Sequence, residues 1–265
     1  MPLVSVITPN FGSFERIERC HQIVRMQTLT DWEHIIVDDG SGQNTGEKLR
    51  AFAETDSRIV PVIANENRGA GAARNLGLNA ATGHYIAFLD VDDHWDREKL
   101  ETQVDFMQSH GVGLCHGSYR IAESEKADKK RYRAQHPPDR VTHAQLLNGC
   151  SIGCLTVMIE ASLLRDVEFQ KYRRGQDWSL WLLLTANGQH FEKFPGLCCT
   201  YTRRSGTLSS NKLRKLIDVW RIYREQESLS VPKAIWCLMR HAHYVLLRPE
   251  YRYHDVHLTK ITKQQ

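Results

Sequence analysis

The 265-residue sequence lacks any stretch of about 20 uninterrupted apolar residues, the length that crosses a bilayer as a helix. The longest apolar run near the C-terminus is interrupted by Lys233 and Arg240. The first residues also lack the basic start and the small-residue cleavage site of an export signal. We therefore expect no membrane-spanning helix and a cytoplasmic protein.

The composition shows none of the biases that mark disordered, collagen-like or low-complexity chains. Glycine (17) and proline (8) are not in excess, and aromatic residues make up 9% of the chain. With 41% hydrophobic residues, the length suffices for one sizeable core, or for a catalytic domain with a short appendage.

The chain also lacks the even number of cysteines that is expected for a disulfide framework, since it has seven. Most lie in apolar runs, which indicates reduced core thiols. A zinc site formed by Cys115, His116, Cys150 and Cys154 is the less favoured interpretation, since the CxxC spacing of a structural zinc site is missing.

The net charge of +4 is small, but it is distributed unevenly. Up to Thr200 there are 22 basic against 26 acidic residues, and from Tyr201 onward there are 13 against 5. A basic tail favours anionic lipid, nucleic acid or phosphorylated ligands, and charge alone does not choose among them. Nucleic acid ranks last, because the tail carries no nucleic-acid-binding motif.

β-Branched apolar runs alternate with helical patterns in the first ninety residues. Strands are predicted at Leu3–Thr8, Glu33–Val37, Arg58–Ala64 and Tyr85–Leu89, with helices at Ser13–Met26, Thr45–Glu54 and Gly71–Ala81. This alternation predicts an α/β fold with a mostly parallel, Rossmann-like sheet flanked by helices. Ligands of such sheets bind beyond the carboxyl ends of the strands. Pro9–Phe11, Asp38–Ser41 and Asp90–Asp93 should meet there.

The second half of the chain predicts fewer strands and ends in two helices. Helices are expected at Asp96–Ser109, Thr142–Leu147, Asp177–Ala186 and Val231–Arg248, and strands at Gly113–Tyr119, Leu155–Ile159 and His190–Thr202. The charged, apolar-poor residues 123–138 indicate a loop. Val231–Arg248 has an apolar helical face that suits core packing or docking on an anionic membrane surface.

Three carboxylates, Asp90, Asp92 and Asp93, directly follow a predicted apolar strand. Their mutual repulsion favours a divalent cation, and an all-oxygen donor set suits Mg²⁺ or Mn²⁺. The alternative is a solvated acidic turn before the next helix, with Asp96 as the helix cap.

Further candidate residues have two interpretations each. Asp39 lies in a second acidic turn, which could be only a polar turn. Arg74 could face the acidic crevice or the solvent. Asp177 starts an apolar helix, either as an N-cap or as a general base whose pKa the positive helix end would lower. Arg203 and Arg204 belong to a Gly/Ser loop that could be a lid or a linker.

The segments VSVITPNF, IIVDDGS, ENRGAGAARNLGL, GHYIAFLDVDD and GQDWSLW occur in this order. Together they resemble the family 2 glycosyltransferases of the GT-A fold, from Val4 to about Ser210. The resemblance implies a GT-A catalytic domain over residues 1–210 and a basic helical extension over residues 211–265. It also implies an inverting transfer of a sugar from a nucleotide sugar, usually a UDP-sugar.

The resemblance further implies roles for individual residues. Pro9 and Phe11 would line the base pocket, Asp39 would accept a hydrogen bond from uracil, and Arg74 would lie near the nucleotide. Asp90 would serve the ribose side, while Asp92, with Asp93, would hold Mn²⁺ or Mg²⁺. Asp177 would be the catalytic base, and Arg203 or Arg204 could close over the diphosphate.

This sequence departs from the family pattern at several positions. Phe11 and Gly12 stand where Tyr-Asn is common, and Gln176 replaces a frequent Glu. The QxxRW motif of processive synthases is missing, which favours addition of a single sugar.

The expected acceptor is a saccharide or a lipid-linked oligosaccharide, with peripheral contact to the anionic inner face of the membrane. Two alternatives are a non-catalytic sugar-nucleotide binding module and a sugar nucleotidyltransferase. The second is disfavoured because the turn after the first strand carries no cation.

Overall fold

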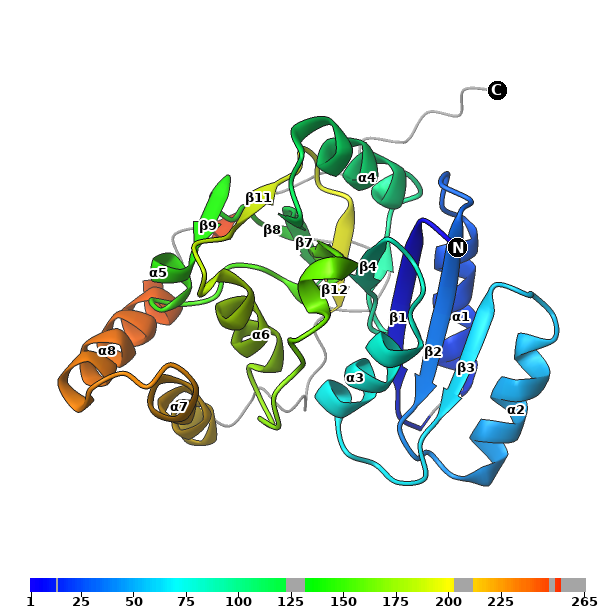
Figure 1. The fold of residues 1–265 in the computed structure, drawn as a ribbon, viewed down its shortest axis with the longest axis horizontal. Helices are drawn as coiled ribbons and strands as arrows, with labels where there is room; N and C mark the ends of the chain where they lie inside the picture. The colour runs from blue at the N-terminus through cyan, green and yellow to red at the C-terminus, as the bar shows by residue number, and fades with distance from the viewer. Residues whose placement is uncertain (13, 123–131, 203–211, 248–250, 254–265) are drawn as a thin grey trace.

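Four parallel strands form the first half of the main sheet (Figure 1). The computed structural model describes residues 1–12, 14–122, 132–202, 212–247 and 251–253. The strands are β1 (Val4–Asn10), β2 (Trp32–Asp38), β3 (Ile59–Ile63) and β4 (Tyr85–Phe88), in the order β3-β2-β1-β4. Every residue of β1 and β2 is buried, because helices cover both faces of the sheet. The predicted α/β fold is confirmed.

The helices between these strands pack on opposite faces of the sheet. They are α1 (Phe14–Arg25), α2 (Gln43–Ala53) and α3 (Ala70–Ala80). Ile36 of β2 packs in one cluster with residues of α1 and α2, whereas Ile35 and Val37 pack with Ala73 of α3. A Cβ on Gly77 would lie 2.5 Å from the Ile7 side chain, so glycine allows α3 to approach β1 closely.

The second half of the main sheet is mixed. It adds β10 (Met158–Glu160), β6 (Leu114–His116), β11 (His190–Lys193) and β9 (Arg140–Thr142), with helices α4 (Lys99–His110), α5 (His143–Leu146) and α6 (Gln176–Thr185). Strand β10 pairs antiparallel with both β4 and β6. The expected strand Leu155–Ile159 is only partly correct, because Cys154–Thr156 form the 3-10 helix η1.

A second sheet of five short strands was not predicted. Its order is β13 (Tyr251–Tyr253), β8 (Tyr132–Gln135), β7 (Tyr119–Ala122), β12 (Cys199–Thr202) and β5 (His94–Trp95). The single strand expected at His190–Thr202 is wrong, because β11 and β12 belong to different sheets and are separated by Pro195–Gly196. Gly113–Tyr119 likewise divides between β6 and β7. Residues 123–131 of the expected loop lie outside the described residues, whereas Tyr132–Gln135 form β8.

Helix α4 begins at Lys99 with Glu98 at its N-cap position, so the expected cap at Asp96 is wrong. The Asp96 carboxylate instead accepts a charge-assisted hydrogen bond from Arg120, on β7. The acidic turn after β4 is therefore not explained by capping of the following helix.

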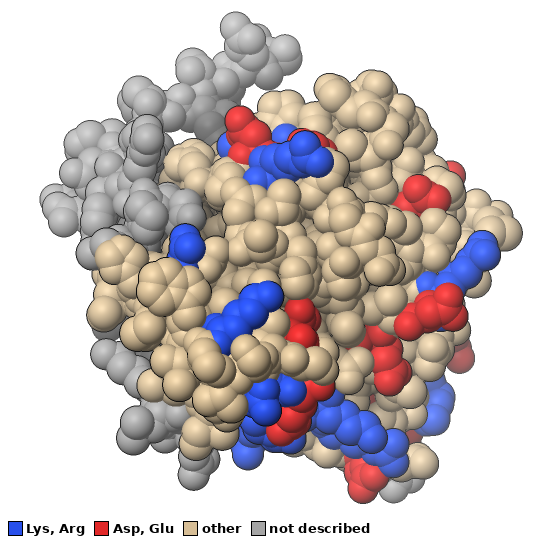
Figure 2. Space-filling view, turned by 60° about the vertical axis from the view of Figure 1, so that its left-hand side comes forward, with Lys and Arg blue, Asp and Glu red and all other residues tan. Residues whose placement is uncertain are grey.

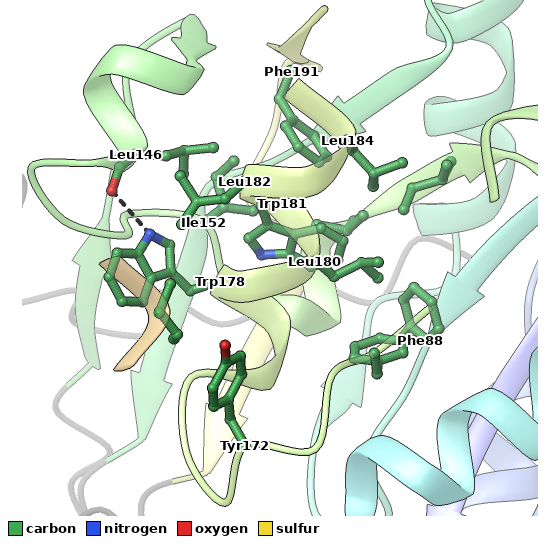
Figure 3. Close-up of a cluster of buried hydrophobic side chains, with 14 of the residues drawn as sticks. Phe88, Leu146, Ile152, Tyr172, Trp178, Leu180, Trp181, Leu182, Leu184 and Phe191 are labelled. Carbon is green, nitrogen blue, oxygen red and sulfur yellow. Dashed lines mark hydrogen bonds between the residues drawn. The ribbon is translucent and has the colours of Figure 1, made fainter. Parts of the chain in front are cut away.

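The C-terminal helices α7 (Lys212–Arg221) and α8 (Val231–Leu247), joined by the π-helical turn η4 (Ile222–Gln226), pack beside α6. Figure 3 shows the buried cluster around α6, in which Trp178 Nε1 donates a hydrogen bond to the Leu146 carbonyl at 2.9 Å. The Trp178 ring also contacts Tyr223 edge-on and His241 of α8. This packing makes the C-terminal helices a wall beside the start of α6. The domain boundary at residue 210 stays a prediction.

None of the described helices combines the length and the apolar character that a membrane span requires. All seven cysteines are free and are buried or half-buried.

Candidate active site

A buried ion pair stands at the carboxyl end of β4. Arg74 of α3 donates to Asp90 Oδ1 at 2.5 Å, and its side chain is almost fully buried. Burial opposes the charge of Arg74, but the acidic neighbours outweigh it, Asp90 first, and raise the pKa of the guanidinium. The Phe169 ring lies 5.5 Å from the guanidinium carbon. Arg74 therefore faces the acidic crevice as a fixed positive charge.

Asp93 lies beside this pair and is also buried. Burial, followed by the negative charges of Asp90 and Asp92, raises the pKa of Asp93 well above its usual range. The backbone N–H of Thr202 donates to Asp93 Oδ1 at 3.3 Å. The acidic turn thus brings carboxylates together at a cost that a cation would relieve.

The residues of this turn fit a divalent cation by donor chemistry. Carboxylate oxygens are the preferred ligands of Mg²⁺ and Mn²⁺, and Asp90, Asp92 and Asp93 supply such oxygens. Within the described part of the chain, no three histidine, cysteine or carboxylate side chains form a complete metal site. The assignment of Asp92 and Asp93 as metal ligands therefore stays a prediction.

Asp177 occupies the second position of α6, and Gly175 takes the N-cap position in a left-handed conformation (φ 70°). Burial and, to a smaller extent, the negative charge of Asp90 raise the pKa of the Asp177 carboxyl, although backbone N–H groups and Arg74 lower it. The net direction is opposite to the one expected from the helix end, because burial outweighs the backbone N–H groups of Asp177 and Trp178 that lower this pKa. A carboxylate with a raised pKa is a better proton acceptor than an ordinary aspartate.

The cavity of about 1320 Å³ beyond the sheet connects these groups. Arg74, Asp90, Asp93 and Asp177 line it together. The remaining wall comes from segments that the sequence did not assign to the site, including Tyr119, Cys154, Tyr172, Asp218, His241 and Tyr244. These residues come from distant parts of the chain with no shared motif, so only the fold could bring them together.

Gln176 precedes Asp177, and no role for it was inferred from the sequence. Its Nε2 donates to the Tyr172 carbonyl at 2.6 Å, and its amide lies 3.0 Å from the position of a Cβ on Gly71. The signal for this contact was the replacement of the frequent family Glu by an amide. Gln176 thereby links the start of α6 to both the preceding loop and α3.

The residues expected at the base pocket lie at the ends of β1 and β2 and do not line this cavity. Pro9 is buried within β1, and the Phe11 side chain is 59% exposed. Asp39 is buried, and its carboxylate accepts hydrogen bonds from the backbone N–H groups of Arg68 (3.0 Å) and Gly69 (2.8 Å). Asp39 thus fixes the start of α3, and its contact with a base stays a prediction.

Arg203 and Arg204 lie outside the described residues. Cys150 and Cys154 line the cavity, whereas Cys115 lies in β6. The zinc site considered from the sequence therefore has no support in the described part of the chain.

The family model described as Glycosyl transferase family 2 matches residues 5–165. TuaG of Bacillus subtilis, a glycosyltransferase assigned to teichuronic acid biosynthesis, is 36% identical over 91% of this chain and 95% of TuaG. WfgD of Escherichia coli, a UDP-Glc:alpha-D-GlcNAc-diphosphoundecaprenol beta-1,3-glucosyltransferase, is 34% identical over 82% of this chain and 84% of WfgD.

Solved structures show the same fold. Residues 1–349 of TarS from S. aureus superpose with a TM-score of 0.68 at 18% identity, covering 93% of this chain and 73% of that one. The mannosyltransferase PcManGT from Pyrobaculum calidifontis gives a TM-score of 0.64 at 18% identity, covering 95% and 76% of the two chains. The fold is GT-A, and the chain belongs to glycosyltransferase family 2.

Proposed function

We propose that this enzyme transfers a sugar from a UDP-sugar to a hydroxyl of a saccharide on a lipid-linked acceptor, in one metal-assisted step that inverts the anomeric carbon. The observation that carries this proposal is the convergence of Asp177, Arg74 and Asp90 in one cavity. The Asp177 carboxylate has a raised pKa suited to accepting a proton, and the Asp90 carboxylate is held by the buried Arg74 guanidinium.

The relatives support the choice of donor and acceptor. WfgD and WfaP of Escherichia coli are both named as glucosyltransferases that use UDP-Glc and a diphosphoundecaprenol-linked sugar. TarS has been solved with UDP-GlcNAc. In this chain the exposed Phe11 ring offers a stacking surface to a nucleobase; Phe11 follows Pro9 and Asn10, whose carbonyl accepts a hydrogen bond from the Asp39 N–H at 2.8 Å. These three residues are the proposed base pocket.

The proposed chemistry separates two tasks. Asp177 accepts the proton of the acceptor hydroxyl while that oxygen attacks the anomeric carbon from the face opposite the leaving diphosphate. A single displacement from that side inverts the configuration. Arg74 keeps its charge and orients Asp90 toward the donor, and Asp92 and Asp93 would hold the metal. Such a metal, when bound, stabilises the negative charge that develops on the leaving diphosphate.

Asp177→Asn tests the assignment, because the amide keeps the size of the side chain and cannot accept the proton. We expect turnover to fall by about 10²–10⁴-fold. UDP should raise the thermal unfolding midpoint as much as in the unchanged enzyme, since the nucleotide site is intact. The matched control is Asp166→Asn, an exposed aspartate outside the cavity, which should leave both measurements unchanged.

Retained transferase turnover in Asp177→Asn would remove Asp177 from the proposal. A protein that binds UDP-sugars yet transfers no sugar to any saccharide acceptor would be a binding module. Release of diphosphate from a nucleoside triphosphate and a sugar phosphate would identify a nucleotidyltransferase instead.

A further inference from the structure

Helix α8 exposes large apolar side chains on its outer side. Trp236 is 58% exposed and Met239 is 54% exposed, and Ile235 and Leu246 are exposed as well. At about 100° per residue, these side chains and that of Arg240 fall within an arc of about 140°, so they share one side of the helix, which we call the outer α8 face. Single exposed apolar residues need no explanation, but a row that includes a tryptophan does.

The opposite side of α8 is part of the protein interior and of the site. Ala234 and Cys237 are buried in the cluster around α6. His241, Tyr244 and Val245 line the cavity that also contains Asp177. One helix therefore separates the cavity from the outer α8 face. Whatever covers that face lies one helix away from the part of the cavity that α8 lines.

The charges on α8 indicate the chemistry of its partner. The 17 residues of the helix include Lys233 and Arg240 and no acidic residue. Figure 2 brings the side of the molecule that carries α8 forward and shows basic and acidic side chains interspersed in the lower half of the view. The partner should therefore accept apolar insertion and carry negative charge, as an anionic bilayer surface does.

A second copy of the chain fits this face less well. A twofold interface through this face would bring two copies each of Lys233 and Arg240 into one contact, and α8 offers no carboxylate from either copy to pair with them. Tryptophan, in contrast, is favoured at the boundary between lipid headgroups and acyl chains.

We propose that the outer α8 face docks on an anionic lipid bilayer, with Trp236 and Met239 inserted at the headgroup level and Lys233 and Arg240 contacting acidic headgroups. The inference rests on the proposed function in one respect, because a lipid-linked acceptor gives the docking its purpose. In the docked enzyme only helix α8 separates the cavity from the membrane surface, near which the sugar of such an acceptor is found.

Vesicle flotation measures the docking without any transfer reaction. The full chain should bind vesicles of phosphatidylglycerol and phosphatidylethanolamine, and bind less at high salt. Met239→Gln combined with Trp236→Gln should lower the partition coefficient about tenfold or more, because both apolar side chains lose their burial in lipid. The matched control for the methionine is Met26→Gln, since Met26 directly follows α1, far from α8 in the sequence, and is 49% exposed.

The basic residues have their own matched pair. Lys233→Gln with Arg240→Gln should weaken binding by about fivefold per charge, whereas Lys48→Gln with Arg50→Gln, both exposed on α2, should not. Circular dichroism and the thermal unfolding midpoint confirm that each variant is folded. Equal vesicle binding by the outer-face variants and their controls would overturn the proposal. The proposal would also be overturned if the unchanged protein proved to be a dimer and the Met239→Gln and Trp236→Gln variant became a monomer while it kept its vesicle binding.

Transfer assays separate this inference from the proposed function. The outer-face variants should keep their turnover on an acceptor whose short lipid chain leaves it soluble without detergent. They should lose turnover when the same sugar is carried by a long lipid chain in vesicles. Vesicle binding without transfer to any acceptor would contradict the proposed function and leave the docking intact. Equal transfer by the variants to both acceptor forms would contradict the docking and leave the proposed function intact.

Discussion

Gln176 shows how a single amide can position a neighbouring carboxylate. Its Nε2 donates to the Tyr172 carbonyl, and its side chain packs against Gly71 at the start of α3. The glutamate that is common at this position in the family could not make that contact while ionised, because a carboxylate only accepts hydrogen bonds. In this chain the amide therefore fixes the start of α6, and with it the direction of Asp177.

The change Gln176→Glu should accordingly be unfavourable here. It places a carboxylate against a carbonyl oxygen, so we expect the free energy of unfolding to fall by about 1–3 kcal/mol near neutral pH. Gln176→Met removes the hydrogen bond without adding charge and should cost less. Urea unfolding at pH 7 compares the three proteins, and a Gln176→Glu variant as stable as the unchanged protein would contradict the hydrogen-bond assignment.

Residue-scale chemistry was predictable from the sequence where charged groups follow a strand closely. Of the two interpretations of Arg74, the structure supports the one in which it faces the acidic crevice, because Arg74 of α3 donates to Asp90 at the carboxyl end of β4. The pKa direction of Asp177 was predicted wrongly, since the helix dipole can be inferred from position and burial cannot. His241 and Tyr244 were missed for the same reason, as they reach the cavity only through the packing of α8 on α6.

At the scale of elements, the turn after β2 illustrates a contact between two loops. Gly40 has a left-handed backbone (φ 73°), and a Cβ on it would lie 2.5 Å from the Asn67 nitrogen and closer still to the Glu66 carbonyl carbon. Asp39, its neighbour, accepts hydrogen bonds from Arg68 and Gly69. The turn after β2 and the loop before α3 therefore hold each other in place.

Gly40→Ala should destabilise the protein strongly. The matched control is Gly111→Ala at the end of α4, where φ is 63° and no atom lies within 4 Å of the added Cβ. The control carries only the left-handed backbone cost of about 1–2 kcal/mol. Gly40→Ala adds overlap with backbone atoms and should cost about 1–3 kcal/mol more, as measured by urea unfolding. Equal losses in the two variants would show that the loops can separate freely.

Element boundaries followed the sequence best in the first ninety residues, where each strand is an apolar run bounded by turn residues. The runs at β1 and β2 are seven residues each and β-branched, so their strands and the intervening helix α1 were predictable. Strands β5 and β12, of two and four residues, have too few positions to show a period of two. Their pairing with each other spans about a hundred residues of chain, which local patterns do not encode.

At the scale of the whole molecule, a buried histidine pair joins elements around the main sheet. His34 of β2 stacks on His21 of α1, and their Nδ1 atoms lie 3.0 Å apart. His34 Nε2 lies 2.9 Å from Thr8 Oγ1, and His21 Nε2 lies 3.4 Å from a carboxylate oxygen of Asp56. Burial, followed by the neighbouring His21, lowers the pKa of His34 well below its usual range. Burial also lowers the pKa of His21, although Asp56 opposes the effect.

Acidification should therefore destabilise the fold through this pair. In the unfolded chain His34 binds a proton below about pH 6.5, whereas in the folded protein it stays neutral to much lower pH. The unfolded state then binds more protons, so stability is fully present above pH 6.5 and is lost as the pH falls below that value. From pH 7 to pH 5 the loss from His34 alone should be about 2 kcal/mol.

Other buried groups also titrate, so the test compares slopes rather than absolute stabilities. Burial lowers the pKa of His116 to about 3 and adds to the acid sensitivity, whereas the raised pKa values of Asp93 and Asp177 act in the opposite direction. These contributions are common to the unchanged protein and to His34→Gln. Urea unfolding of both at pH 7 and pH 5 should show a smaller acid-induced loss in His34→Gln, by about 2 kcal/mol. Identical slopes would mean that His34 is already protonated in the folded protein at pH 5, and that its burial beside His21 does not hold it neutral.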